Sequence, residues 1–135
     1  MTQPAGQLDV SALQRALREF ARERDWDQFH TPKNLVMALA GEVGELIELF
    51  QWLEPADSHR VMDDAGRAEA VRDELADVLN YLLRIADLLG VDLGAAAWAK
   101  IAKNAEKYPV ALARGNAIKY SELAPGAPDD PEPSE

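Results

Sequence analysis

Apolar residues recur at helical spacing in four stretches of the chain, and no stretch shows the strict alternation of a half-buried strand. In the first stretch, the apolar positions from Leu13 to Phe20 predict a helix over about 11–25. Ser11 is the expected N-cap, because Gln14 follows three residues later as a capping-box partner. The chain therefore begins, after a short polar start, with an amphipathic helix.

A second helix is expected from Thr31, the predicted cap, to about Leu53. Pro32 suits its first turn, where the missing N–H costs nothing. The polar segment 54–66 reads as an exposed loop. The side chains expected to face the core from this helix are Leu35, Leu39, Leu46 and Phe50.

A third helix is expected from Arg67 to a left-handed stop at Gly90, and a fourth from a cap at Asp92 to just before Pro109. The predicted fold class is all-α, a four-helix bundle. We expect a flexible N-terminus over 1–10, one helical domain over 11–123, and a disordered, Pro-rich acidic tail over 124–135.

The third helix is apolar over well more than one face, and a helix of that kind is buried on most sides. A bundle this small cannot bury so much apolar surface within one chain. An oligomer is therefore favoured over a monomer that exposes an unusually large apolar surface. The residues concerned are Val71, Leu75, Val78, Leu79, Leu82, Leu83, Ile85, Leu88 and Leu89. We expect Leu79, Leu82, Leu83, Leu88 and Leu89 to lie near the centre of the assembly.

The amino-acid composition argues against several classes of function for this chain. The 135 residues carry a formal net charge of −10, which disfavours sequence-independent binding to nucleic-acid polymers or anionic membranes. The absence of cysteine excludes disulfides and thiolate metal sites. The chain shows no signal-peptide pattern and no long apolar run, so the expected compartment is the cytoplasm.

Two pairs of acids carry the candidate chemistry. Glu42 and Glu45 lie three apart on the second expected helix, and Glu74 and Asp77 lie three apart on the third. This spacing puts each pair on one helix face, and antiparallel packing would bring the pairs together. Four such carboxylates repel one another, so either a cation lies between them or their pKa values rise, and a hard ion such as Mg²⁺ or Mn²⁺ is the natural occupant. Solvated surface acids are the alternative, although the apolar neighbours of both pairs favour a position at the edge of the core.

Other candidate residues are less specific. Lys100, Lys103 and Lys107, with Asn104, share one face of the fourth helix and suit phosphate groups, although an ordinary solvated lysine face explains them equally well. The aromatic residues at helix ends either stack on a base or plug the bundle. His30 could bond a base or phosphate.

Several segments resemble the MazG-like all-α nucleotide pyrophosphohydrolases. Their signature, Glu-x-x-Glu followed after a gap by Glu-x-x-Asp, is met by the two acid pairs. The stretches Phe-His-Thr-Pro-Lys-Asn from Phe29, Phe-Gln-Trp from Phe50, Asn-Ala-Glu-Lys-Tyr-Pro from Asn104 and Lys-Tyr-Ser-Glu-Leu from Lys119 are similar to the dCTP pyrophosphatase branch. The resemblance covers roughly 20–123.

The resemblance implies hydrolysis of a deoxynucleoside triphosphate, dCTP or a modified dCTP, to the monophosphate and pyrophosphate, as nucleotide-pool housecleaning. It implies Mg²⁺ on Glu42, Glu45, Glu74 and Asp77, and a homotetramer. By matching positions it implies that the base and sugar pocket is shaped by Trp26, His30, Trp52, Tyr81, Asn104 and Tyr108. The residues implied to meet the phosphates are Lys100, Lys107 and Lys119.

The corresponding mechanistic hypothesis is metal-assisted attack of water on the α-phosphorus, with Glu42 or Glu45 orienting or deprotonating the water. The sequence leaves open the base, the number of metal ions and the choice between these two carboxylates. A di-iron carboxylate bundle would need histidines in the acid motifs, and the two histidines, His30 and His59, lie outside them. The non-enzymatic alternative is a helical oligomerisation or interaction module whose acids lie on the surface.

Overall fold

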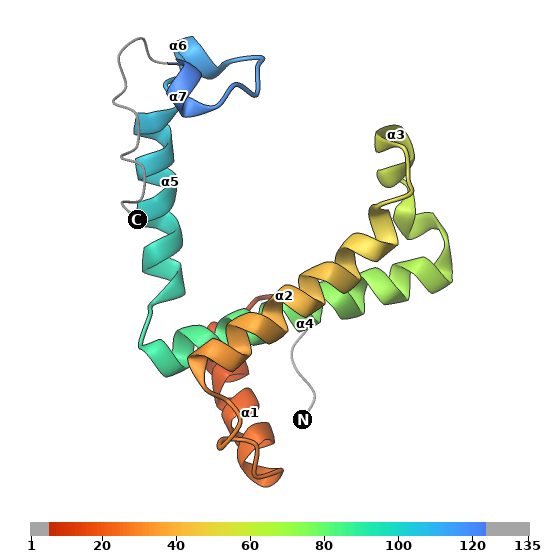
Figure 1. The fold of residues 1–135 in the computed structure, drawn as a ribbon, viewed down its shortest axis with the longest axis vertical. Helices are drawn as coiled ribbons and strands as arrows, with labels where there is room; N and C mark the ends of the chain where they lie inside the picture. Colours follow the sequence, from red (N-terminus) through yellow and green to blue (C-terminus); the bar gives the residue numbers. More distant parts are fainter. Residues whose placement is uncertain (1–5, 124–135) are drawn as a thin grey trace, which may run out of the picture. The chain divides into compact units, whose positions relative to one another are not determined.

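Helices make up all the regular secondary structure of the computed structural model, which describes residues 6–123 (Figure 1). The all-α prediction is therefore confirmed for this part of the chain. The predicted tail, 124–135, and half of the predicted flexible start lie outside the described residues. In chain order the elements are α1 (Val10–Glu23), α2 (Pro32–Phe50), α3 (Pro55–Ser58), the 3₁₀ turn η1 (Val61–Asp63), α4 (Ala65–Leu89), α5 (Leu93–Lys107), α6 (Val110–Ala113) and α7 (Tyr120–Leu123).

Three of the predicted helix boundaries are confirmed by their capping groups. Thr31 Oγ1 accepts a hydrogen bond of 3.2 Å from the backbone N–H of Asn34 at the start of α2. Asp92 Oδ1 accepts one of 2.9 Å from the N–H of Ala95 at the start of α5. Gly90, with φ of 66°, ends α4 in the left-handed conformation that glycine adopts without a steric cost.

Two local predictions are wrong. Asp9, not Ser11, caps α1, because the Asp9 carboxylate accepts from the Ala12 N–H at 2.9 Å and Val10 is already helical. The segment 54–66 is not a plain loop, since it folds into α3 and η1. Ser58 supports this compact path by donating its hydroxyl hydrogen to the Pro55 carbonyl at 2.6 Å.

The first compact unit, Met1–Val91, is built around α4. The helices α2 and α4 run antiparallel along one another, as predicted, and α1 packs against α4 (Figure 1). Gln14 ties α1 to α4 by donating from Nε2 to the Leu83 carbonyl at 3.1 Å. The side chains buried in this unit include Ala21, Leu35, Val71, Leu83, Ile85 and Ala86.

Some of the apolar side chains of α4 are buried within the single chain, and others are exposed. Leu83 is 1% exposed and already belongs to the core of the unit, so the expectation that it lies between subunits is wrong. Leu75, Leu82, Leu88 and Leu89 remain 52%, 40%, 42% and 57% exposed in the single chain. No helix within residues 6–123 has the length and apolar composition needed to cross a bilayer.

The second compact unit, Asp92–Glu135, contains α5, α6 and α7. It is held internally by an edge-to-face contact between the rings of Tyr108 and Tyr120, whose centroids are 6.3 Å apart. The Lys107 ammonium lies 5.5 Å from the centre of the Tyr120 ring. The prediction of one helical domain over 11–123 stays a prediction.

Candidate functional site

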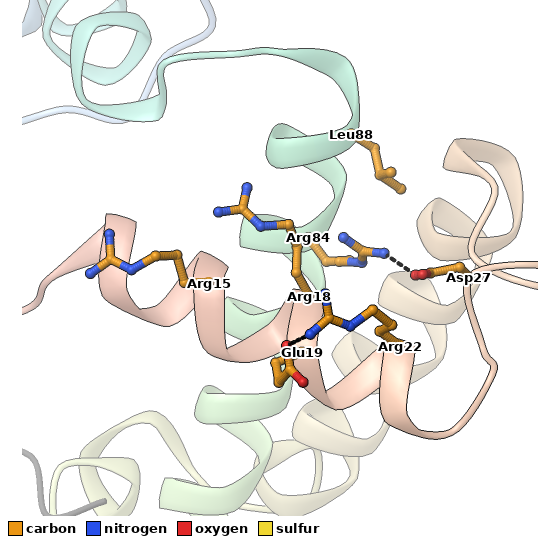
Figure 2. A pocket seen from close by; sticks show the side chains of 7 residues that line it. All are labelled: Arg15, Arg18, Glu19, Arg22, Asp27, Arg84 and Leu88. Atoms are coloured by element: carbon orange, nitrogen blue, oxygen red, sulfur yellow. Dashed lines mark hydrogen bonds and ion pairs between the residues drawn. The ribbon is translucent and has the colours of Figure 1, made fainter.

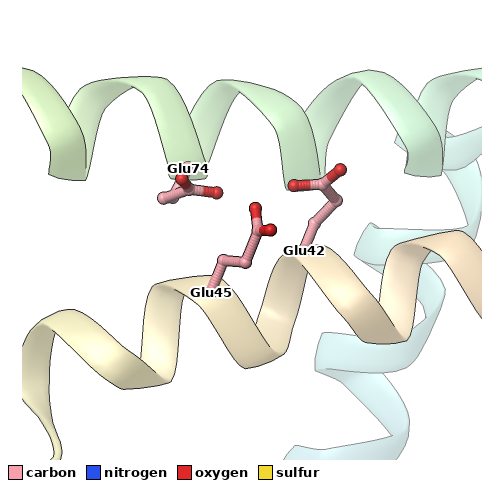
Figure 3. Close-up of side chains that lie close together, drawn as sticks. All are labelled: Glu42, Glu45 and Glu74. Carbon is pink, nitrogen blue, oxygen red and sulfur yellow. The ribbon is translucent and has the colours of Figure 1, made fainter.

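The acids of α2 and α4 form a cluster between the two helices. One carboxylate oxygen each from Glu42, Glu45 and Glu74 lies within 4.8 Å of the others, and the three side chains point into the same space (Figure 3). The i, i+3 spacing on α2 puts Glu42 and Glu45 on one face, and the antiparallel α4 brings Glu74 opposite them. Helix pairing was predicted to gather four acids, and the structure brings oxygens of three of them into one cluster, without Asp77.

Two carboxylate oxygens of the cluster are buried without a hydrogen-bond partner in the part of the chain that the structure describes. Glu42 Oε2 and Glu74 Oε2 are shielded from solvent and have no hydrogen-bond partner among the described residues. Polar atoms removed from water are normally paired, because leaving them unpaired costs free energy. Such oxygens therefore point to a group that would satisfy them.

The pKa values of the clustered carboxyl groups also indicate that a further group belongs among them. Burial raises the pKa of the Glu42 carboxyl above its ordinary value, and the hydrogen bond and charge of Glu45 raise it further. The pKa of Glu74 is also raised, first by burial and then by the charges of Glu45 and Asp77. A cation among these oxygens would reverse both effects. Because the donors are all carboxylate oxygens, they suit a hard divalent ion such as Mg²⁺ or Mn²⁺.

Asp77 lies beside the cluster rather than within it. Its charge contributes to the raised pKa values of Glu42 and Glu74, so it faces the same space. It also lines a neighbouring pocket of about 380 Å³. Asp77 is therefore close to both the carboxylate cluster and that pocket.

The neighbouring pocket is aromatic and brings together three of the predicted substrate residues. Trp26, His30 and Tyr81 line it, although they come from the α1–α2 connection and from α4. Phe20 meets Trp26 edge to face with ring centroids 5.7 Å apart, and the Trp26 and His30 rings are 6.1 Å apart. Flat rings around a pocket of this size can receive another flat ring.

Two titratable side chains in the pocket are held neutral. Burial raises the pKa of the Tyr81 phenol, helped by the charges of Glu42 and Asp77. Burial also lowers the pKa of His30, helped by the nearby Arg84 guanidinium. The pocket therefore offers a neutral phenol and a neutral imidazole beside an acidic cluster.

The sequence did not identify three further lining residues, Phe20, Asn80 and Arg84. Phe20 was assigned only to the apolar face of the first helix. Asn80 and Arg84 lie one turn apart on α4, and a polar pair within an apolar helix is the signal that would have indicated a polar wall.

Of the remaining predicted site residues, Trp52 belongs to the first unit and does not line this pocket, and the others belong to the second unit. Trp52 follows α2, is 87% exposed, and lies at the far end of that helix from His30. A helix of 19 residues separates the two by roughly 28 Å. In the second unit, α5 carries Lys100, Asn104 and Lys107 on an exposed surface, Tyr108 caps α5, and Lys119 precedes α7.

The glycines of the first acid motif do not mark a close contact within the chain. A Cβ added at Gly41 or Gly44 would meet no atom within 4 Å outside the local helix backbone. No neighbouring helix of the described chain therefore requires glycine at either position. The space beside them is open.

The fold and the site together define an all-α protein with a carboxylate cluster beside an aromatic pocket. Residues 38–123 match the model of the MazG-like family, and the chain belongs to this family. It is 47% identical to dCTP pyrophosphatase 1 of Rattus norvegicus over 114 residues, which covers 84% of this chain and 67% of the relative. It is 46% identical to dCTP pyrophosphatase 1 of Homo sapiens over 115 residues, covering 85% and 68%.

A solved structure agrees with this assignment. The fold matches the crystal structure of a pyrophosphatase from Archaeoglobus fulgidus with a TM-score of 0.69 and 37% sequence identity. The match covers 80% of this chain and 99% of that chain.

Proposed function

We propose that this chain is a nucleoside triphosphate pyrophosphohydrolase that converts dCTP, or a modified dCTP, to the monophosphate and pyrophosphate. The observation that carries the proposal is the carboxylate cluster with two unpartnered oxygens beside an aromatic pocket. The names of the relatives support the reaction and the cytosine base. Removal of unwanted nucleotides from the precursor pool is the corresponding role, and it places the proposed activity in the cytoplasm.

The proposed metal ligands are Glu42, Glu45, Glu74 and Asp77, and the proposed ion is Mg²⁺, with Mn²⁺ as an alternative. The hard oxygen donors and the unpartnered atoms of Glu42 and Glu74 fit such an ion. When bound, the ion would neutralise charge on the phosphate oxygens. Both carboxylates with raised pKa values would then be ionised.

Other roles in the proposed reaction, namely accepting a proton from water and binding the base, fall to side chains of the chain itself. A water molecule attacks the α-phosphorus, its proton passes to Glu42 or Glu45, and pyrophosphate leaves with the bonding electrons. The base stacks on Trp26, because stacking on an aromatic ring is worth about 1–3 kcal/mol per base. The neutral Tyr81 phenol and His30 imidazole supply hydrogen bonds at the pocket wall.

The second unit supplies the proposed phosphate contacts. Lys100, Lys107 and Lys119 are cations suited to a triphosphate, and Asn104 and Tyr108 offer hydrogen-bonding groups for base or sugar. Trp52 is proposed as a further stacking residue. Its 87% exposure leaves the indole ring free to meet another group.

We also propose that the chain completes a four-helix bundle and assembles as a homotetramer. The exposed leucines of α4 support an assembly, because soluble monomers rarely expose a large apolar patch. They are Leu75, Leu82, Leu88 and Leu89. The acids of α4 lie on the same helix, so assembly and activity are expected to be coupled.

A hydrolysis screen tests the reaction. Purified protein with Mg²⁺ is given the canonical and several cytosine-modified deoxynucleoside triphosphates, and both products are identified. We expect dCMP and pyrophosphate from dCTP in one step. An initial release of dCDP and orthophosphate would contradict attack at the α-phosphorus. No hydrolysis of any nucleotide would favour a non-enzymatic interaction module.

A further inference from the structure

Arg84 is a buried cation within an apolar stretch of α4. It is 7% exposed and stands between Leu83 and Ile85, which are both buried. Burying a guanidinium is costly unless its donors are paired. Its partners therefore indicate why the chain keeps a charge at this position.

Each nitrogen of the Arg84 guanidinium meets a different group. Nη2 donates to Asp27 Oδ1 at 2.8 Å, and Figure 2 shows this ion pair reaching from α4 to the α1–α2 connection. Nη1 lies 3.6 Å from Asp87 Oδ2 on the next turn of α4. Nε donates to His30 Nδ1 at 3.4 Å. The two carboxylates fix the guanidinium plane and aim its Nε–H at the imidazole.

The direction of the contact with His30 determines where the imidazole carries its proton. A guanidinium has donors only and stays protonated, so His30 Nδ1 must accept. A neutral imidazole that accepts at Nδ1 carries its hydrogen on Nε2. A proton on Nδ1 would face the Nε–H of Arg84, so the contact selects one tautomer.

The backbone keeps His30 in this place. Its N–H donates to the carbonyls of Trp26 at 3.1 Å and Asp27 at 3.2 Å. The charged groups acting on the imidazole are Arg84 from α4 and Asp27 from its own connection, and they act in opposite directions. Because Arg84 holds the Asp27 carboxylate in an ion pair, the same residue orients the ring and offsets the acid that would favour its protonation.

We propose that Arg84 is a positioning residue that holds His30 as the neutral Nε2–H tautomer, so that the aromatic pocket presents a hydrogen-bond donor to its ligand. The matching ligand atom is an acceptor on a base, such as the unprotonated ring nitrogen or the carbonyl oxygen of cytosine. Thymine and uracil carry a hydrogen on the corresponding ring nitrogen. The identity of the ligand rests on the function proposed above, whereas the state of His30 does not.

Nitrogen-15 NMR of the ligand-free full chain tests the state of His30 directly. The chain has two histidines, so a His59→Gln variant assigns the signals. We expect wild-type His30 to carry its proton on Nε2 and to titrate below the ordinary histidine value of about 6.5. In Arg84→Met we expect a mixture of tautomers and a higher pKa. A wild-type signal for hydrogen on Nδ1, or a His30 titration unchanged by Arg84→Met, would overturn the proposal.

A matched variant separates this role from a general loss of charge. Arg18 pairs with Asp87 at 2.8 Å, but the described contacts of His30 do not include it. Arg18→Met should leave the tautomer and titration of His30 unchanged. If Arg84→Met does not fold, the double variant Arg84→Met with Asp27→Asn removes the unpaired acid, and the tautomer of His30 is then the readout, because the groups that lower and raise its pKa are lost together. A pure Nε2–H tautomer in this double variant would overturn the proposal. An equal effect of Arg18→Met on His30 would count against Arg84 as the specific partner.

Kinetics supply the second readout. At about pH 8, Arg84→Met should raise KM for dCTP by about fivefold, the worth of one ordinary hydrogen bond, with kcat within about twofold. The KM of Arg84→Met should rise further as pH falls through about 6.5, because His30 then becomes protonated in this variant. A base that covers the charged imidazolium removes water from it, and this loss of hydration weakens binding. Wild-type KM should rise less than that of the variant over this interval, because the His30 pKa is lowered in the wild type. A fall in kcat with KM unchanged would contradict the positioning role, whereas failure of wild type to hydrolyse dCTP would contradict the proposed function and leave the NMR result to decide on Arg84.

Discussion

Replacing Glu42 by Gln tests whether the carboxylate cluster is a cation site, because the change removes one charge and keeps the shape. Glu42 has a raised pKa and an unpartnered, shielded oxygen. A carboxyl whose pKa is higher in the folded than in the unfolded state destabilises the fold as pH rises through the folded value. Metal-free Glu42→Gln should therefore be at least as stable as wild type near pH 7.5.

The size of the Mg²⁺ effect follows from mass action. An ion at one hundred times its Kd stabilises the native state by about 2.7 kcal/mol. The entropy of unfolding is about 2.1 cal/mol/K per residue, or roughly 0.28 kcal/mol/K for 135 residues. Wild-type Tm should then rise by about 10 °C. At the same Mg²⁺ concentration, Glu42→Gln should gain less than about 3 °C, because one of the few ligands has lost its charge.

The assay is thermal unfolding at fixed protein concentration, in EDTA and across a Mg²⁺ titration. The control is Glu48→Gln, which removes the same charge from an exposed position of α2 outside the three-residue cluster. It should keep the full Mg²⁺ response and full turnover, whereas Glu42→Gln should lose most of both. A full Mg²⁺ response in Glu42→Gln, or an equal loss in Glu48→Gln, would refute the assignment of the site.

Three further predictions concern pH, the base and the assembly. Because the pKa values of Glu42 and Glu74 are raised above 4.5, Tm in EDTA should fall as pH rises through those values, while the Tm gain from Mg²⁺ should grow; parallel changes would contradict competition between protons and the ion. Trp26→Ala should raise KM for dCTP roughly tenfold with little change in kcat, and Trp98→Ala, an exposed residue of α5, should not. Leu88→Glu should give smaller species in light scattering with reduced activity, and a wild-type protein that is already monomeric at micromolar concentration would count against the assembly.

The helices were predictable because their ends carry local signals. Thr31, Gly90 and Asp92 act through groups within a few residues, so their roles follow from the sequence alone. The same reasoning predicted Ser11 as the cap of the first helix, because Gln14 completes a capping-box pattern and the apolar spacing begins at Leu13. The structure extends the helix to Val10, and the earlier acid, Asp9, then becomes the cap.

In the candidate site, too, some positions follow from local spacing in the sequence and others do not. Glu42 and Glu45 share a face because of helical spacing, and a connection between two helices was enough to predict that Glu74 meets them. Trp52 is different, because spacing along α2 gives the direction of a side chain but not which pocket it reaches. Trp26 precedes α2 and Trp52 follows it, so the length of this helix separates the two indole rings.

Arg84 shows how a sequence can contain a signal whose meaning depends on packing. Arg84 lies in an apolar stretch of α4, and the structure shows that its side chain is buried, where an arginine is rarely found unless it is paired. The partners could not be predicted, because Asp27 and His30 are 57 and 54 residues away in the chain. Since those partners include a wall of the aromatic pocket, the residue that least fits the helical pattern is also the one that connects the core of α4 to the proposed recognition of the base.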